Sequence, residues 1–213
     1  MAQRIRIRDT FLLLSITIVP ILLVAATLFW WEIETDEEGK FHPHILAASR
    51  QHRVPKELIK AVIWKESRFN SNAHGGADER GLMQVTPAAG MDWAKAERVE
   101  NFDPDDLFDV RVNIQAGTWY LARALKRWSE ADDPLPFALA EYNAGPVHAR
   151  RWADAAGRLD SVLFCQKVDF PTTRQYIQDV VQRREYYRLH PAPGPVDFLK
   201  DRLGIFIEKL KKR

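Results

Sequence analysis

The sequence is poor in cysteine, in net charge and in strand-like patterns. Its 213 residues include a single cysteine, so no disulfide can form within the chain and the fold must be stabilised by its core. The formal net charge is only +2, which gives no reason to expect a nucleic-acid partner. No run alternates apolar and polar residues convincingly. These absences favour an all-α protein in which Cys165 is a buried apolar residue beside Phe164.

Metal-binding side chains are also not grouped as a metal site requires. His42, His44 and His52 lack a cysteine or carboxylate that would complete a zinc site, and Pro43 breaks their local spacing. Residues 103–109 contain four aspartates but not the glycine and terminal glutamate of a calcium loop, so helix capping is the better interpretation. We therefore expect no metal and no cofactor.

Charged residues are absent from residues 11–31, a stretch near the amino terminus. A helix of that length spans about 30 Å, the thickness of a bilayer core. Residues 1–10 are basic and residues 32–40 are acidic, so the positive-inside rule predicts a cytoplasmic segment, a single transmembrane anchor and an acidic linker. The rest of the chain would then lie in the periplasm, attached to the inner membrane. A signal peptide cleaved near Val24-Ala25-Ala26 is the alternative.

Residues 41–190 carry the pattern of one helical domain. Apolar spacing, caps and prolines predict helices over 45–53, from 55 through Glu66, and over 87–97, 110–128, 137–142, 147–156 and 172–189, with at most a minor β element within 73–85. The helix over 110–128 is expected to be the central one. For residues 191–213 the sequence predicts a proline-rich linker and a basic amphipathic tail, suited to an anionic membrane surface or, alternatively, to packing on the domain.

A carboxyl group lies on the apolar face of one predicted helix. Leu58, Ile59, Val62 and Ile63 recur at the spacing of a buried face, and Glu66 continues that stripe. Burial disfavours an ionised carboxyl, so the pKa of Glu66 should rise, as a general acid working near neutral pH requires. For an isolated helical glutamate, the alternative is an ordinary surface ion pair.

Three further segments accompany Glu66-Ser67. They are Gly81-Leu82-Met83-Gln84-Val85-Thr86-Pro87, Ala140-Glu141-Tyr142-Asn143-Ala144-Gly145 and Thr173-Arg174-Gln175-Tyr176. In order and spacing, these segments resemble the signature segments of the soluble-lytic-transglycosylase family, over roughly residues 41–190. The resemblance implies a lysozyme-like α-helical domain that cuts the MurNAc-GlcNAc β-1,4 bond of peptidoglycan. It also implies a 1,6-anhydro product, formed without water.

The resemblance assigns Glu66 as the one catalytic carboxyl, acting first as an acid and then as a base. It implies substrate-binding roles for Ser67, Met83, Gln84, Tyr142, Asn143 and Tyr176, in which Met83 forms an apolar wall and the two tyrosines bond the reacting carboxyl or the sugar. No second carboxylate is obvious, although Asp78, Glu79 and Glu141 are near in sequence. We expect Asp78→Asn and Glu79→Gln each to retain most of the activity.

The sequence departs from the family pattern at a few positions. Gly75 stands where a serine is frequent, Asp78-Glu79 replaces Gly-Ala, and Thr172 replaces a glutamate. These departures concern details of the groove. Two other functions stay open at this point: a lysozyme-like or chitinase-like hydrolase, which usually needs a second carboxylate and a positioned water, and a non-catalytic wall-binding scaffold.

Overall fold

The computed structural model describes residues 38–157 and 159–191. The chain divides into two compact units, 1–43 and 44–213. Of the first unit, the described part comprises the 3₁₀ helix Gly39–Phe41 and the start of helix α2 (His42–His52). The predicted anchor over 11–31 and the predicted tail helix lie outside the described residues. Within the described ranges, no helix combines the length and apolar character needed to cross a membrane.

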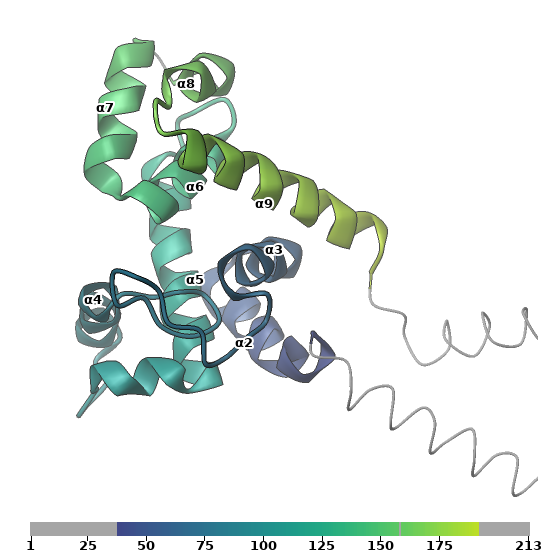
Figure 1. Cartoon of the computed structure of the whole chain (residues 1–213), viewed down its shortest axis with the longest axis vertical. Coiled ribbons are helices and arrows are strands. Elements are labelled where there is room, and N and C mark those ends of the chain that lie inside the picture. Colours follow the sequence, from purple (N-terminus) through teal and green to yellow (C-terminus); the bar gives the residue numbers. More distant parts are fainter. Residues whose placement is uncertain (1–37, 158, 192–213) are drawn as a thin grey trace, which may run out of the picture. The chain divides into compact units, whose positions relative to one another are not determined.

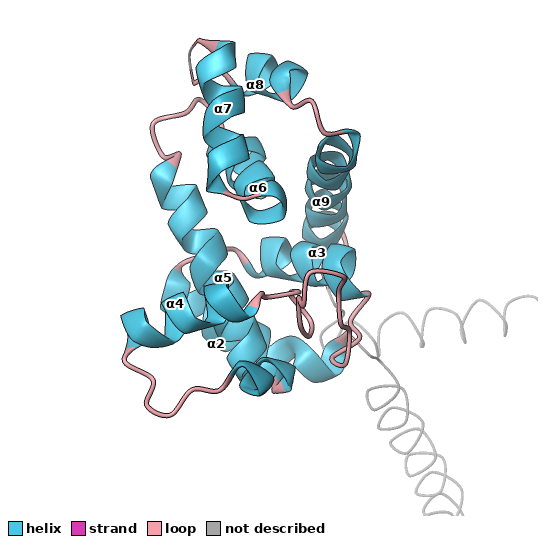
Figure 2. Cartoon of the chain, turned by 60° about the vertical axis from the view of Figure 1, so that its left-hand side comes forward, coloured by secondary structure: helices cyan, strands magenta, loops and turns pink. Residues whose placement is uncertain are grey.

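The described part of the second unit is built from helices (Figures 1 and 2). After α2 come α3 (Lys56–Ser67), α4 (Pro87–Glu97), the 3₁₀ helix η2 (Pro104–Phe108), α5 (Val110–Arg127), α6 (Pro134–Ala144), α7 (Pro146–Ala156), α8 (Ser161–Lys167) and α9 (Pro171–Leu189). The described residues contain no strand, but two isolated antiparallel bridges join His74 to Arg80 and Arg80 to Val85. The all-α prediction is confirmed, and the bridges lie in the loop where a minor β element was expected.

Side-chain caps set where several helices begin. The Thr86 hydroxyl accepts a hydrogen bond from the Ala89 N–H, with Pro87 at the first helical position of α4, as the sequence predicted. Asp103 and Asp106 form a reciprocal capping box on η2. Asp109 then caps α5 by accepting from the Val112 N–H. These aspartates therefore cap helices, as predicted.

Three elements differ from the predictions. Helix α2 begins at His42, earlier than expected, because Pro43 fits the first turn, where the N–H that proline lacks would have no partner within the helix. Helix α6 begins at Pro134 because Asp133 caps it. The short helix α8 was not predicted. On it Phe164 is fully buried but Cys165 is only half-buried, so the expectation of a buried cysteine was wrong.

The centre of the core is α6 rather than α5. Every residue of α6 from Leu135 to Glu141 is buried, and the helix packs against α5, α7, α8 and α9. Helix α5 still presents the predicted buried face of Ile114, Gly117, Leu121 and Ala124. Helix α9 packs along α3, from which it is far in sequence (Figure 1). This pairing brings the carboxyl end of the domain to the helix that carries Glu66.

Candidate active site

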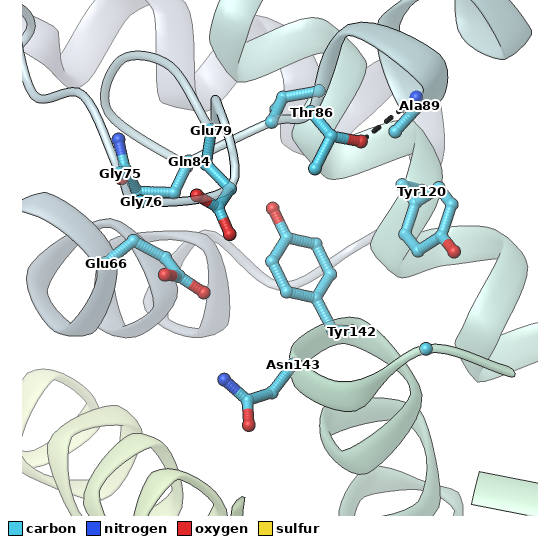
Figure 3. A pocket seen from close by; sticks show the side chains of 12 residues that line it. Glu66, Gly75, Gly76, Glu79, Gln84, Thr86, Ala89, Tyr120, Tyr142 and Asn143 are labelled. Atoms are coloured by element: carbon cyan, nitrogen blue, oxygen red, sulfur yellow. Dashed lines mark hydrogen bonds between the residues drawn. The ribbon is translucent and has the colours of Figure 1, made fainter. Parts of the chain in front are cut away.

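A pocket of about 490 Å³ opens where α3, the loop before α4, α5 and α6 meet (Figure 3). Its lining residues come from all of these elements and from the first turn of α4: Glu66, Gly75, Gly76, Glu79, Gln84, Val85, Thr86, Ala89, Tyr120, Tyr142, Asn143 and Gly145. The lining is mixed, with carboxyl, amide and phenol groups beside small residues. Such a concave, polar-lined surface can hold a carbohydrate.

The carboxyl group of Glu66 reaches this pocket from the last turn of α3. Its Oε1 accepts a hydrogen bond of 2.6 Å from the Tyr176 hydroxyl. Burial raises the pKa of Glu66 from 4.5 to about 7, the Tyr176 hydrogen bond opposes that rise, and the negative charge of Glu79 adds to it. Near neutral pH Glu66 therefore exists in both protonation states, as a group that gives up and later takes back a proton must.

Helix α9 supplies the partner of this carboxyl. Tyr176 is buried, and burial together with the charge of Glu66 raises its pKa well above the ordinary value, so its hydroxyl stays a donor. Lys65, the residue before Glu66 on α3, forms an ion pair of 2.6 Å with Asp179 of α9. The hydrogen bond from Lys65 lowers the pKa of Asp179. Two polar contacts thus attach α9 to the end of α3.

Tyr142 forms the opposite wall of the pocket from α6. Its hydroxyl donates a hydrogen bond of 2.8 Å to the backbone carbonyl of Met83, and its ring meets Tyr120 edge-on. This approach requires a small residue on α5, because a Cβ on Gly117 would lie 2.7 Å from Met83 Cβ and 3.1 Å from the Tyr142 hydroxyl. The Tyr142 hydroxyl therefore fixes the loop relative to α6, while its ring lines the pocket.

The loop between α3 and α4 is held from inside by its own side chains. Gln84 Nε2 donates to the carbonyls of Ala73, at 3.1 Å, and Gly81, at 2.9 Å. The Ser67 hydroxyl donates to the Leu82 carbonyl at 2.8 Å and so joins the end of α3 to the loop. The loop conformation therefore depends on Gln84 and Ser67.

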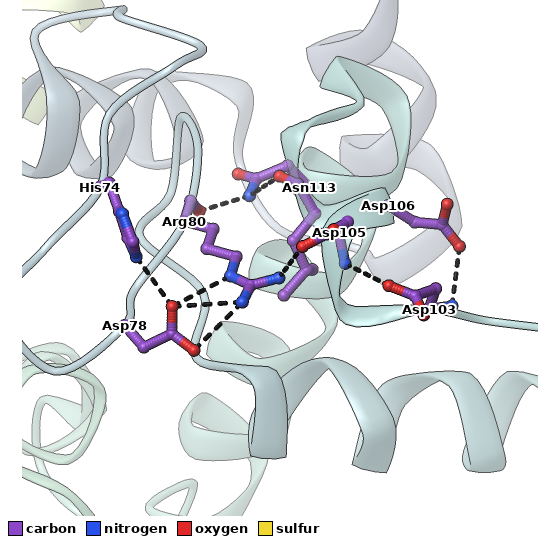
Figure 4. A network of polar contacts seen from close by, with 8 residues as sticks. His74, Asp78, Arg80, Asp103, Asp105, Asp106 and Asn113 are labelled. Carbon is purple, nitrogen blue, oxygen red and sulfur yellow. Dashed lines mark hydrogen bonds and ion pairs between the residues drawn. The ribbon is translucent and has the colours of Figure 1, made fainter.

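A second network holds the outer side of the loop (Figure 4). Arg80 bonds both carboxylate oxygens of Asp78 and, at 2.7 Å, Asp105. Behind it, buried Asn113 of α5 accepts from the Met83 N–H at 2.7 Å and donates to the carbonyls of Arg80 and Leu107. Sequence reasoning missed Asn113. The hint that the sequence offers is the position of this amide side chain, which lies next to Ile114 on the buried side of α5.

The structure distributes the residues predicted from sequence over three kinds of position. Those that line the pocket are Glu66, Gln84, Tyr142 and Asn143. Tyr176 touches Glu66 from α9. Ser67 and Met83 support the loop instead, and Met83 is fully buried. Asn143 accepts a hydrogen bond from the Thr173 hydroxyl, and its amide nitrogen lies on the side of Glu66 (Figure 3).

The three carboxyls near Glu66 in the motif sequences have different surroundings. Glu141 is buried and bonds the Trp128 indole and Arg127. Asp78 is bonded by Arg80, as described above. Glu79 lines the pocket. In the described part of the chain, no group of three or more His, Cys, Asp or Glu side chains is placed to hold a metal ion.

Comparisons with known proteins agree on one relationship. Residues 43–164 match the family model described as the transglycosylase SLT domain. The chain is 31% identical over 144 residues to the soluble lytic murein transglycosylase of Escherichia coli K12, covering 67% of this chain and 22% of that protein. It is 37% identical over 114 residues to the membrane-bound lytic murein transglycosylase F of Desulfosudis oleivorans, covering 52% of this chain and 23% of that protein.

The fold agrees as well. The crystal structure of the 70 kDa soluble lytic transglycosylase from Escherichia coli superposes with a TM-score of 0.65 and 27% identity, covering 76% of this chain and 26% of that one. This chain spans about a quarter of the length of the two relatives named above. The similarity therefore concerns one domain, and that domain contains the pocket.

Proposed function

Because the chain belongs to the transglycosylase SLT domain family, we propose that it is a lytic transglycosylase that cleaves the MurNAc-GlcNAc β-1,4 bond of peptidoglycan. The observation that carries this proposal is the position of the Glu66 carboxyl, which meets the Tyr176 hydroxyl at 2.6 Å in a pocket lined by polar groups, where its pKa is raised to about 7. A single carboxyl with that pKa can serve as acid and base in turn.

In the first step, protonated Glu66 gives its proton to the glycosidic oxygen while the bond to C1 of the muramic sugar breaks. Positive charge develops on that sugar, and its acetamido group assists at C1. In the second step, the Glu66 carboxylate takes the proton of the sugar's 6-hydroxyl, whose oxygen closes on C1. Glu66 is again protonated, and the product carries a 1,6-anhydro ring. The Tyr176 hydroxyl stabilises the carboxylate between the steps.

The other predicted residues contact the substrate or support the pocket walls around it. We assign substrate contacts to Gln84, Tyr142 and Asn143, all of which line the pocket. Ser67 and Met83 contribute by holding the loop that forms one wall. The relatives named as lytic murein transglycosylases favour this reaction over simple hydrolysis or a non-catalytic scaffold.

The muropeptides that the full chain releases from purified peptidoglycan test both the proposed substrate and the proposed role of Glu66. Mass analysis should find 1,6-anhydro ends, and Glu66→Gln should fold but reduce their release by about 10²–10⁴-fold. Glu57→Gln, the same change on the first turn of α3 and outside the pocket, is the matched control and should act like the wild type. Reducing ends in place of anhydro ends would show a hydrolase instead.

We also propose that residues 11–31 anchor the chain in the inner membrane and that the helical domain works in the periplasm. The support is the uncharged stretch with basic residues before it and acidic residues after it, together with a membrane-bound relative. A reporter fused after Arg213 should be active only in an exported compartment, and the protein should stay with membranes at high salt. A soluble protein that begins near Thr27 would instead show a cleaved signal peptide.

A further inference from the structure

The loop wall of the pocket carries a second carboxyl group. Glu79 lines the same pocket as Glu66, and Figure 3 shows both side chains directed into it, Glu66 from α3 and Glu79 from the loop. The Ala77 N–H donates to Glu79 Oε2 at 2.9 Å, which fixes the direction of the side chain. Among the described residues, no lysine or arginine forms an ion pair with Glu79, since Arg80 is turned toward Asp78 and Asp105.

The neighbouring glycine makes room for this carboxyl. A Cβ on Gly75 would overlap Glu79 Oε2 and would lie 2.8 Å from Gln84 Oε1. The Gly75 N–H also donates to the Glu79 carbonyl at 2.7 Å, so that the two residues face each other across the loop. Gly75 and Glu79 are two of the positions at which the sequence departs from the family pattern. In space these departures are complementary, because the missing side chain at 75 leaves room for the carboxyl at 79.

Glu66 is faced by ionisable groups from each surrounding element. Tyr176 of α9 donates a hydrogen bond to it, Tyr142 of α6 stands across the pocket, and Lys65 precedes it on α3. Glu79 is the acidic member of this set, and its charge raises the pKa of Glu66. Neutralising Glu79 should therefore make Glu66 a stronger acid that loses its proton at a lower pH.

We propose that Glu79 is the second carboxylate of this active site: it faces the positive charge that develops on the muramic sugar and keeps Glu66 protonated for the first step. This inference rests on the proposed function and replaces the expectation that Glu79 is dispensable. Both contributions, to the sugar and to Glu66, are electrostatic, so no bond to Glu79 forms or breaks. A negative charge fixed in the same pocket stabilises a cation that develops there.

The test measures the pH profile of anhydro-muropeptide release by the full chain with Glu79→Gln, Glu79→Asp and Asp78→Asn. Glu79→Gln should lower kcat/KM by about tenfold or more and should move the alkaline limb of the profile to lower pH. Glu79→Asp keeps the charge, so its alkaline limb should stay near that of the wild type and part of the rate should return. Asp78→Asn is the matched control from the same loop: it weakens the contact with Arg80 and can change the rate, but its alkaline limb should stay at the wild-type pH.

Two results separate this inference from the proposed function. If the wild type releases anhydro ends and Glu79→Gln has the same rate and the same alkaline limb, the role of Glu79 is wrong and the proposed function stands. If the wild type releases no anhydro ends at all, the proposed function itself fails. A loss of rate in Glu79→Gln without movement of the alkaline limb, unrescued by Glu79→Asp, would show that the side chain only supports the loop.

Discussion

Replacing Glu66 by glutamine should stabilise the fold at alkaline pH and leave it almost unchanged in acid. In the folded chain the pKa of Glu66 is about 7, against an ordinary value of 4.5. Between these pH values the folded state keeps a proton that the unfolded state has lost. The free energy of unfolding therefore falls as pH rises through this window, because ionised Glu66 is poorly solvated in its half-buried position. Glutamine has no proton to lose, so it does not carry this cost.

The size of the effect follows from the width of the window. At about 1.4 kcal/mol per pH unit, the interval from 4.5 to about 7 corresponds to a free energy of about 3 kcal/mol. Below about pH 4 the cost is absent from both proteins. The amide oxygen of glutamine can still accept the hydrogen bond from Tyr176, so no compensating loss is expected there.

Urea unfolding of both proteins, followed by near-ultraviolet circular dichroism, would measure this difference at several pH values from about 4 to about 8. The unfolding free energy of Glu66→Gln should exceed that of the wild type by a margin that grows with pH and levels off above about 7. Glu57→Gln serves as the control and should show no growing margin. A margin that is flat across the pH range would refute the claim that burial raises the pKa of Glu66.

Three other substitutions test the surroundings of the pocket. Tyr176→Phe removes the hydrogen bond that lowers the pKa of Glu66, so the alkaline limb of the activity profile should move to higher pH; an unmoved limb would contradict this. Asn113→Ala removes three hydrogen bonds to the backbone, although the Arg80 carbonyl still accepts from the Val85 N–H, and should lower the unfolding free energy by about 3 kcal/mol in urea titration, at about 1 kcal/mol for each lost bond. Gly117→Ala brings a methyl group against Met83 and should cost about 1–3 kcal/mol in the same assay, whereas Gly76→Ala, which meets open space, should cost less.

The parts of the fold that depend on neighbours in sequence could be predicted from the sequence. The cap at Thr86 and the apolar stripe that carries Glu66 are both local, because each involves residues within one or two turns. Helix α8 was missed because it has only seven residues, too few for apolar spacing to repeat. The capped start of α6 at Asp133 was obscured by Pro134 and Pro136, which suggested a break.

Contacts between distant segments explain the gaps in the site prediction. The motif predicted Met83 at a pocket wall, yet its side chain is fully buried and its backbone bonds Asn113 of α5 and Tyr142 of α6. Those partners are 30 and 59 residues away, and no local pattern reveals them. The pocket position of Glu79 has a nearer cause: a Cβ at Gly75, four positions earlier, would overlap its carboxylate, and the sequence shows only that both positions are unusual for the family.

The pairing of α3 with α9 sets the order in which the site can mature as the chain is made. Tyr176 lies 110 residues after Glu66, and α9 is the last helix in the described part of the chain. A nascent chain therefore exposes Glu66 long before it contains either the phenol that hydrogen-bonds this carboxyl or the Asp179 that pairs with Lys65. A chain that stalls before α9 has emerged lacks both of these contacts. The surroundings of Glu66 are therefore complete only when the last described helix has been made.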